Sequence, residues 1–174
     1  MISGRFGEMK YPSFHDELAS EESFYVNIFK PYIKSLGWDV IFLRYNNDVG
    51  IFDMMQRKYD IDAIVDTGSK NVSVSLKVVK KQYNNIFFET VSNCSTGTTG
   101  WGYYSAADYI CYAMDAKEQY LLIFFKASDI RRLNIEQYPV AYGKTYINGR
   151  LVYETKGHLI PITNFENNIV KLDK

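Results

Sequence analysis

The sequence contains three short apolar stretches in succession, YDIDAIVD at residues 59–66, VSVSLKVV at 72–79 and IFFETVS at 86–92. Their alternating, β-branched and aromatic composition predicts strands, and TGSKN at residues 67–71 predicts a turn that closes the first two into a β-hairpin. Each strand also contains an acidic residue or a lysine. A strand core normally excludes such groups, because an unpaired buried charge costs several kcal/mol. Charges on three successive strands therefore indicate a site.

Side chains alternate between the two faces of a strand, which allows the charged groups to be assigned to faces. On the second strand Ser75 and Lys77 share one face, and on the first strand Asp62 points away from the apolar side. On the third strand Glu89 shares a face with two apolar residues. If these faces align, Asp62, Lys77 and Glu89 converge beside Ser75. Asp60 is expected to be a turn or edge charge.

Such a cluster has the chemistry of a site for a divalent cation and a phosphate. Mg²⁺ prefers hard oxygen ligands and keeps several waters. Asp62 and Glu89 would supply two carboxylates, and a backbone carbonyl near Leu76 would supply a third ligand. The bound Mg²⁺ or Mn²⁺ would acidify a water and stabilise negative charge on a phosphodiester. Lys77 would orient that water or neutralise the non-bridging oxygens.

The remaining elements follow from periodicity and turn residues. A helix with apolar residues from Leu18 to Leu36 is expected after a capping box at Ser13–Asp16, with an interruption at Pro31 and an end at Gly37. The other expectations are a strand at 38–45, a loop at 46–50, an irregular segment at 51–58, a mobile loop at 93–102, a helix at 106–114, a strand at 119–126, a helix at 128–137, short strands in a turn-rich segment at 138–156 and an edge segment at 159–162. This order predicts an α/β (α+β) fold with a mixed central β-sheet flanked by helices.

Composition limits the classes of protein. A chain of 174 residues is most often one domain with a real core. The formal net charge is +0 and the pI is about 6.7, which counts against a protein that coats DNA but not against a nuclease whose metal supplies positive charge. Two cysteines without metal-ligand spacing predict reduced thiols. Because no apolar run approaches membrane-spanning length, we expect a cytoplasmic protein with no membrane partner.

The charged strands, together with the segments at 86–89, Gly100-Trp101 and 107–110, resemble the PD-(D/E)xK nuclease superfamily. The resemblance covers roughly residues 21–125 and implies a restriction-endonuclease-like core of one domain, with a C-terminal extension at about 138–174. It matches Asp62 to the family's aspartate and Lys77 to its lysine. It also implies an endonuclease that cleaves nucleic acid, DNA rather than RNA, with Mg²⁺ or Mn²⁺, a small phage-type member, and a possible homodimer. An additional acid on the first helix of the family corresponds to Glu22.

One position departs from the family pattern. The acid two residues before the lysine is replaced by Ser75, and a hydroxyl is a poor substitute for a carboxylate ligand. Two interpretations remain open. Glu89 on the neighbouring strand supplies the missing carboxylate, or the chain is a catalytically inactive nuclease-fold protein that binds nucleic acid or a partner protein, such as a phage anti-defence factor.

Overall fold

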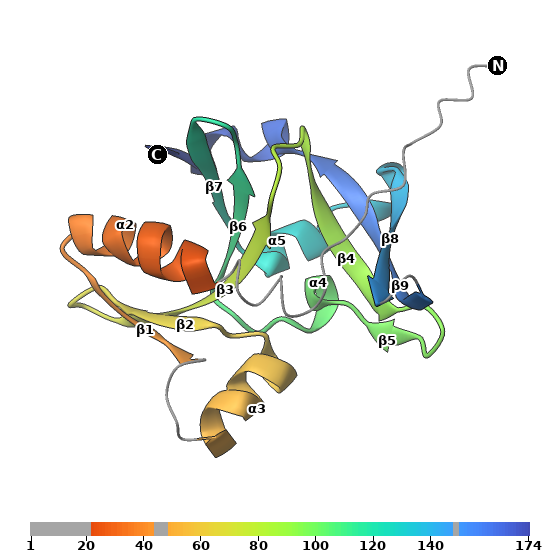
Figure 1. The fold of residues 1–174 in the computed structure, drawn as a ribbon, viewed down its shortest axis with the longest axis horizontal. Coiled ribbons are helices and arrows are strands. Elements are labelled where there is room, and N and C mark those ends of the chain that lie inside the picture. The colour runs from red at the N-terminus through yellow and green to blue at the C-terminus, as the bar shows by residue number, and fades with distance from the viewer. Residues whose placement is uncertain (1–21, 44–48, 148–149) are drawn as a thin grey trace.

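The structure, a computed structural model, describes residues 22–43, 49–147 and 150–174. These residues form two β-sheets with helices around them (Figure 1). The first sheet is mixed and curled, because β3 and β6 pair in parallel while its other neighbours are antiparallel. Its strand order is β1 (Asp39–Phe42), β2 (Ala63–Asp66), β3 (Asn71–Val79), β6 (Tyr109–Asp115), β7 (Gln119–Phe125) and β10 (Ile169–Asp173). The predicted mixed sheet with flanking helices is confirmed.

The second sheet was not predicted. It is antiparallel, in the order β5 (Thr98–Thr99), β4 (Asn85–Asn93), β9 (Arg150–Pro161) and β8 (Val140–Ile147). The prediction of a turn-rich segment at 138–156 is therefore wrong, because β8 and β9 form a long hairpin. The segment predicted at 159–162 is the end of β9, which pairs there with β4, and Ile162 begins the following helix. The C-terminal part of the chain thus supplies strands to both sheets.

The first helix is interrupted near the proline, as predicted. A π-helical segment η1 (Tyr25–Phe29) is followed by α2 (Lys30–Ser35), with Pro31 in the first turn of α2. A proline ring clashes with the carbonyl four residues earlier, so a wider turn before it relieves the contact. Gly37 has φ +77° and ends the helix, as expected. The predicted capping box at 13–16 lies outside the described residues.

The β2–β3 hairpin is confirmed, but the segment before it differs from the prediction. Residues 51–58 are not irregular, and they belong to the helix α3 (Val49–Tyr59). Methionine, glutamine, arginine and lysine favour helices, and this intrinsic propensity outweighs the weak apolar periodicity. The strand β2 therefore begins at Ala63 instead of Tyr59. Residues 60–62 connect the end of α3 to this strand.

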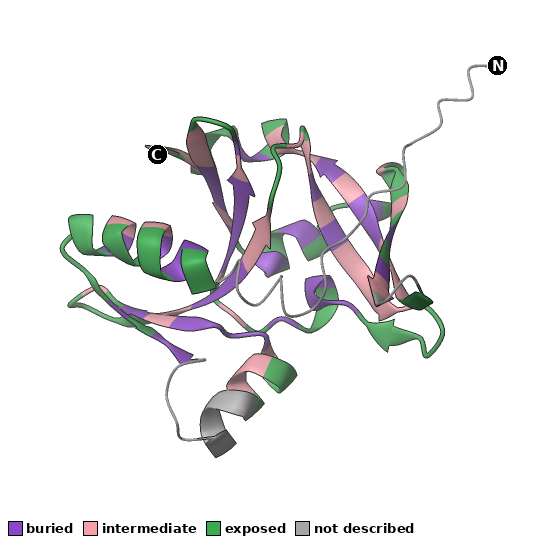
Figure 2. Ribbon diagram, viewed as in Figure 1, coloured by how far each residue is buried: buried purple, intermediate pink, exposed green. Residues whose placement is uncertain are grey.

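The largest error concerns the helix predicted at 106–114, because residues 109–114 belong to the strand β6. Strand β6 and its neighbour β7, which was predicted at 119–126, lie in the middle of the first sheet and are buried on both faces (Figure 2). A strand buried on both faces loses the alternation that distinguishes it from a buried helix. The loop predicted at 93–102 contains β5 and the start of the short helix α4 (Trp101–Tyr104). The helix predicted at 128–137 is divided into α5 (Ala127–Arg131) and η3 (Ile135–Gln137).

Two apolar clusters lie on opposite faces of the first sheet. One joins the first helix to the sheet, with Phe29 and Ile33 against Val65 and Leu76. The other joins the opposite face to the second sheet, α4 and α5. Its members include Ile110, Met114 and Ile123 from the first sheet and Ile86, Phe88, Ile160, Trp101 and Ile130 from the covering elements. The molecule therefore has three layers, the first helix, the first sheet and the second sheet with α4 and α5. Helix η4 (Ile162–Asn168) leads into β10.

Candidate functional site

Charged and polar side chains are buried where α3 ends and the β2–β3 hairpin opens. Asp60 and Asp62 are each 6% exposed, and Ser75 is 0% exposed. Burial of this kind requires hydrogen-bonded partners, because a buried polar group without one is costly. The contacts of these three residues therefore define the candidate site.

Asp60 is the centre of the cluster. Its Oδ1 lies 2.5 Å from Nζ of Lys77, and its Oδ2 accepts a hydrogen bond from Ser75 Oγ at 2.8 Å. Asp60 has φ +54°, a left-handed conformation that aspartate tolerates better than most residues and that ends helices. Its N–H donates to the Gln56 carbonyl at 3.0 Å. The end of α3 thus aims this carboxylate at Lys77.

Asp62 is held by the backbone of the neighbouring strand. Its Oδ2 accepts the Leu76 N–H at 2.8 Å, and its Oδ1 accepts a hydrogen bond from Gln56 Nε2 at 3.4 Å. Ser75 Oγ lies 3.4 Å from the same Oδ2, so both aspartates converge on one hydroxyl. The N–H and C=O of a strand residue point to the same side, so the Leu76 carbonyl is directed toward this edge as well.

Lys77 remains a cation in this environment. Burial alone would lower its pKa, but the negative charges of Asp60 and Asp62 and the hydrogen bond to Asp60 outweigh burial and raise the pKa above its ordinary value. The ammonium also lies 5.6 Å from the ring centroid of Trp101, a favourable cation–π position. The site thus holds a fixed positive charge beside two carboxylates.

Tyr104 connects this cluster to Glu89 on the second sheet. The pKa of Tyr104 is raised chiefly by burial, and the charges of Asp60, Glu89 and Asp62 raise it further while Lys77 lowers it. The phenol therefore keeps its proton at neutral pH and lies within the field of three carboxylates. Glu89 is on β4, directly before a register shift in the pairing of β4 with β9.

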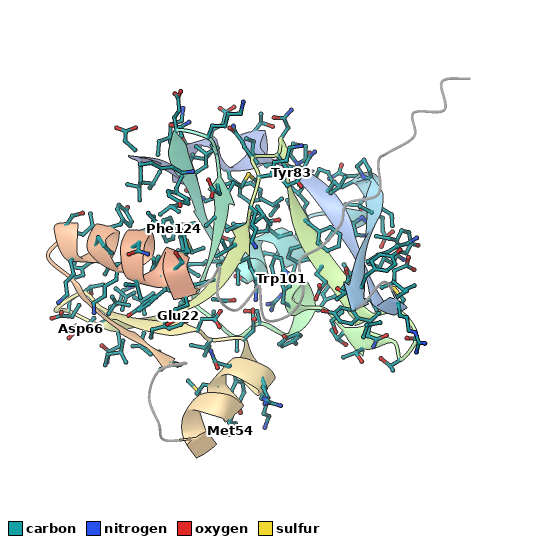
Figure 3. All side chains as sticks on the ribbon, viewed as in Figure 1. Glu22, Met54, Asp66, Tyr83, Trp101 and Phe124 are labelled. Atoms are coloured by element: carbon teal, nitrogen blue, oxygen red, sulfur yellow. The ribbon has the colours of Figure 1, made fainter. Side chains whose placement is uncertain are left out.

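Two glycines allow α4 to approach β4 closely. A Cβ at Gly100 or Gly102 would lie 2.6 Å from the Glu89 carbonyl oxygen, which is closer than real Cβ atoms come. Arg131 fixes the other side of α4, because its Nε donates to the Gly102 carbonyl at 2.7 Å and its Nη2 to the Ser105 carbonyl at 2.6 Å. This packing puts Trp101 near the centre of the molecule (Figure 3).

The structure brings Asp62, Ser75 and Lys77 into one cluster. Glu89 is near this cluster, because its negative charge acts on Tyr104, on which Asp60, Asp62 and Lys77 also act. Glu22 lies on the first described turn of the N-terminal helix and is exposed. Sequence reasoning missed Asp60, which is a buried partner of Lys77 instead of an edge charge. It also missed Tyr104. The DID spacing at 60–62 was the available signal for Asp60.

The donor set suits a hard cation only in part. Carboxylate and carbonyl oxygens are the ligands that Mg²⁺ prefers, and Mg²⁺ is commonly held by one or two carboxylates together with waters and substrate phosphates. Within residues 22–43, 49–147 and 150–174, no group of three histidine, cysteine, aspartate or glutamate side chains is arranged to hold a metal ion. Asp62 and Glu89 can therefore hold Mg²⁺ only together with backbone, water or substrate oxygens.

Comparisons with protein-family models, curated proteins and solved structures give no significant match. None of the helices in the described part of the chain has the length and apolar character needed to cross a bilayer. What the protein does must therefore be inferred from the residues of the site and their geometry.

Proposed function

We propose that this protein is a metal-dependent endonuclease that hydrolyses phosphodiester bonds in DNA. The observation that carries the proposal is the buried cluster in which Asp60, Asp62 and the Ser75 hydroxyl converge beside the Lys77 ammonium. A lysine kept charged beside carboxylate oxygens has the chemistry needed to bind a phosphodiester and to compensate the negative charge of its transition state.

The restriction-endonuclease-like fold is part of the proposal. The antiparallel β1–β2–β3 meander, with β6 parallel to β3 and a helix packed on the sheet, supports it. The location of the polar cluster at the open end of the hairpin, between β2 and the middle of β3, supports it as well. By the same resemblance, the enzyme is a phage-type protein that acts in the cytoplasm, in a host cell if the chain is viral.

Each residue has a distinct role in this proposal. Asp62, Glu89 and the Leu76 carbonyl would hold Mg²⁺ or Mn²⁺, which when bound would supply an acidified water and positive charge. Lys77 neutralises a non-bridging phosphate oxygen, and Tyr104 donates its retained proton in a hydrogen bond to the phosphate. Asp60 is a positioning residue that orients Lys77. Water adds to phosphorus, the bond from phosphorus to the leaving oxygen breaks, and the proton that the water loses ends on that leaving oxygen. Glu22 is an additional acid at the margin of the site.

A cleavage assay tests the proposal directly. Single-stranded and duplex DNA and RNA oligonucleotides are incubated with wild-type protein in Mg²⁺, in Mn²⁺ and in EDTA. We expect cleavage of DNA that EDTA abolishes, a loss of at least about 100-fold in Lys77→Met, by analogy with the removal of one charge-stabilising group, and wild-type rates in Lys80→Met, a matched change at an exposed lysine nearby. Equal rates in the two lysine variants would overturn the assignment.

A second candidate function follows from Ser75. The position that holds a carboxylate in the resembling family here holds a hydroxyl, which donates to Asp60. A chain that has lost its metal would still bind nucleic acid or a partner protein through the same surface. DNA binding without cleavage in Mn²⁺ would favour this inactive member. A homodimer is also proposed from the resemblance, and sedimentation of the purified protein would test it.

A further inference from the structure

An open groove begins at Glu89 and follows the second sheet away from the buried cluster. Its volume is about 420 Å³, and it lies among strands β4, β5 and β9. The residues that line it are Glu89, Ser92, Asn93, Thr98, Tyr153 and Thr155. Glu89 joins the groove to the cluster, because its side chain packs against Gly100 and the ring of the adjacent Trp101 lies 5.6 Å from the Lys77 ammonium. A ligand at the cluster would extend naturally into this groove.

The lining is polar but almost uncharged. Among the residues that the structure describes, Glu89 is the only acidic side chain in this lining, and no lysine or arginine belongs to it. A phosphate group is better placed at the Lys77 ammonium, which lies beside the buried cluster. The groove instead offers hydroxyls, a carboxamide and the ring of Tyr153, which suit a flat, neutral, hydrogen-bonding group.

Two side chains have the features of a base-binding surface. Tyr153 is half-buried, and no other aromatic ring among the described residues stacks on it. The Asn93 carboxamide oxygen accepts hydrogen bonds from the Ser95 N–H at 3.0 Å and its hydroxyl at 2.6 Å. This arrangement fixes the carboxamide, and its Nδ2 carries two N–H donors of the kind that bond to the carbonyl oxygens of a base.

We propose that this groove receives the nucleobase of an unpaired nucleotide whose phosphate lies at Lys77, so the substrate is a single strand or an extruded nucleotide. The inference deepens the proposed nuclease function and rests on it. The base stacks on Tyr153, and Asn93 donates to its edge. A base that is paired within a duplex cannot enter the groove, because both its faces and its edge are already occupied.

Binding of fluorescent oligonucleotides tests the inference without cleavage, in buffer that lacks divalent ions. The probes are a 12-nucleotide thymidylate strand, an abasic strand of equal length and a 12-base-pair duplex. We expect wild-type protein to prefer the thymidylate strand over both others. Tyr153→Ala should weaken that binding roughly 10-fold, the loss typical of one stacked base, and should remove the preference over the abasic strand. Tyr153→Phe should keep the preference, as should Tyr142→Ala, a matched change at an exposed tyrosine outside the groove.

Each contrary outcome has a defined meaning. Equal affinity of wild-type protein for the three probes, no binding of any probe, or an unchanged preference in Tyr153→Ala would overturn the base-binding groove. The outcome of the cleavage assay separates this result from the fate of the proposed function. Cleavage that depends on Lys77 but not on Tyr153 would overturn the base-binding role of the groove and leave the nuclease proposal in place. A Tyr153-dependent preference for the thymidylate strand without cleavage in Mn²⁺ would overturn the nuclease proposal and leave the base-binding role of the groove in place.

Discussion

The two ends of the β2–β3 hairpin contain the same kinds of side chain in opposite environments. At the turn, Asp66 is exposed and its Oδ1 accepts the Gly68 N–H at 2.8 Å. At the open end, Asp60 and Asp62 are buried against Ser75 and Lys77. Figure 3 shows Asp66 at the outer tip of the hairpin, far from Trp101 near the centre.

The aspartates at the two ends differ in role. Asp66 shapes the local chain, whereas a contribution to folding stability does not explain the buried cluster. The hydrogen bond that Asp66 accepts from the Gly68 N–H closes a turn, which is an ordinary local role for aspartate. The buried cluster has no such local role. Apolar residues of similar volume often replace a buried ion pair at no loss of stability, whereas removal of one partner is strongly destabilising. A chemical function therefore explains the buried cluster better than a contribution to folding stability does.

The largest effect is expected for Asp60→Ala. The substitution removes the ion-pair partner of the half-buried Lys77 ammonium and the nearer acceptor of the buried Ser75 hydroxyl, and it forces alanine into a left-handed conformation. We expect the free energy of unfolding to fall by about 3–5 kcal/mol, measured by urea denaturation. Asp60→Asn tolerates the same φ and keeps an acceptor, so its loss should be smaller. Equal stability of wild type and Asp60→Ala would contradict the buried ion pair.

Ser75→Ala should have an intermediate effect. It removes the donor to Asp60 and leaves a buried carboxylate oxygen short of one hydrogen bond, which costs about 1–3 kcal/mol. Ser73→Ala is the matched control on the same strand, because Ser73 donates to Asp108 at an exposed position. Thermal or urea unfolding measures the loss in the free energy of unfolding for each variant, and we expect the larger loss in Ser75→Ala. A larger loss of stability in Ser73→Ala than in Ser75→Ala would contradict the claim that the Ser75 hydroxyl contributes more to stability.

The ion pair also predicts a dependence of stability on alkaline pH. The pKa of Lys77 is raised above its ordinary value of 10.5, so above that pH the unfolded chain releases a proton that the folded chain keeps. The free energy of unfolding therefore falls as pH rises. In Lys77→Met this fall should be shallower, by up to about 1.4 kcal/mol per pH unit for one proton. Identical slopes in the two proteins would show that Lys77 gains no charge partner on folding.

The smallest effect is expected at the turn. Asp66→Ala removes one exposed side-chain bond to Gly68 and should lower the free energy of unfolding by about 0.5–1 kcal/mol. Cleavage should keep its wild-type rate, because the residue lies at the opposite end of the hairpin from Lys77. A variant that unfolds as easily as Asp60→Ala, or that loses cleavage, would erase the distinction between the two ends.

Local sequence signals predict the hairpin well. Alternation in residues 72–79 and the TGSKN turn predict the second strand and the antiparallel hairpin, and the same alternation puts Ser75 and Lys77 on one face. The proximity of Asp62 to Lys77 follows from that register. These features depend on neighbours within a few residues or across one short turn, so the sequence is sufficient to predict them.

The remaining features depend on contacts between distant segments. Asp60 is buried because α3 ends in a left-handed residue directly before the sheet, and the helix itself was missed. Trp101 and Tyr104 reach the site because α4 packs on β4, whose partner β9 is distant in sequence. Local patterns do not specify such pairings. The same limit explains the missed strand β6, which has no alternation because both its faces are buried.

Binding of Mn²⁺, followed by calorimetry in wild type, Asp62→Asn and Asp66→Asn, tests the central claim most directly. The buried end of the hairpin is predicted to hold the metal, so wild type and Asp66→Asn should bind Mn²⁺ with equal affinity and Asp62→Asn should lose binding. A DNA cleavage gel on the same samples should follow the same order. An absence of Mn²⁺ binding in wild type, or equal binding in all three proteins, would contradict a metal-dependent site at Asp62.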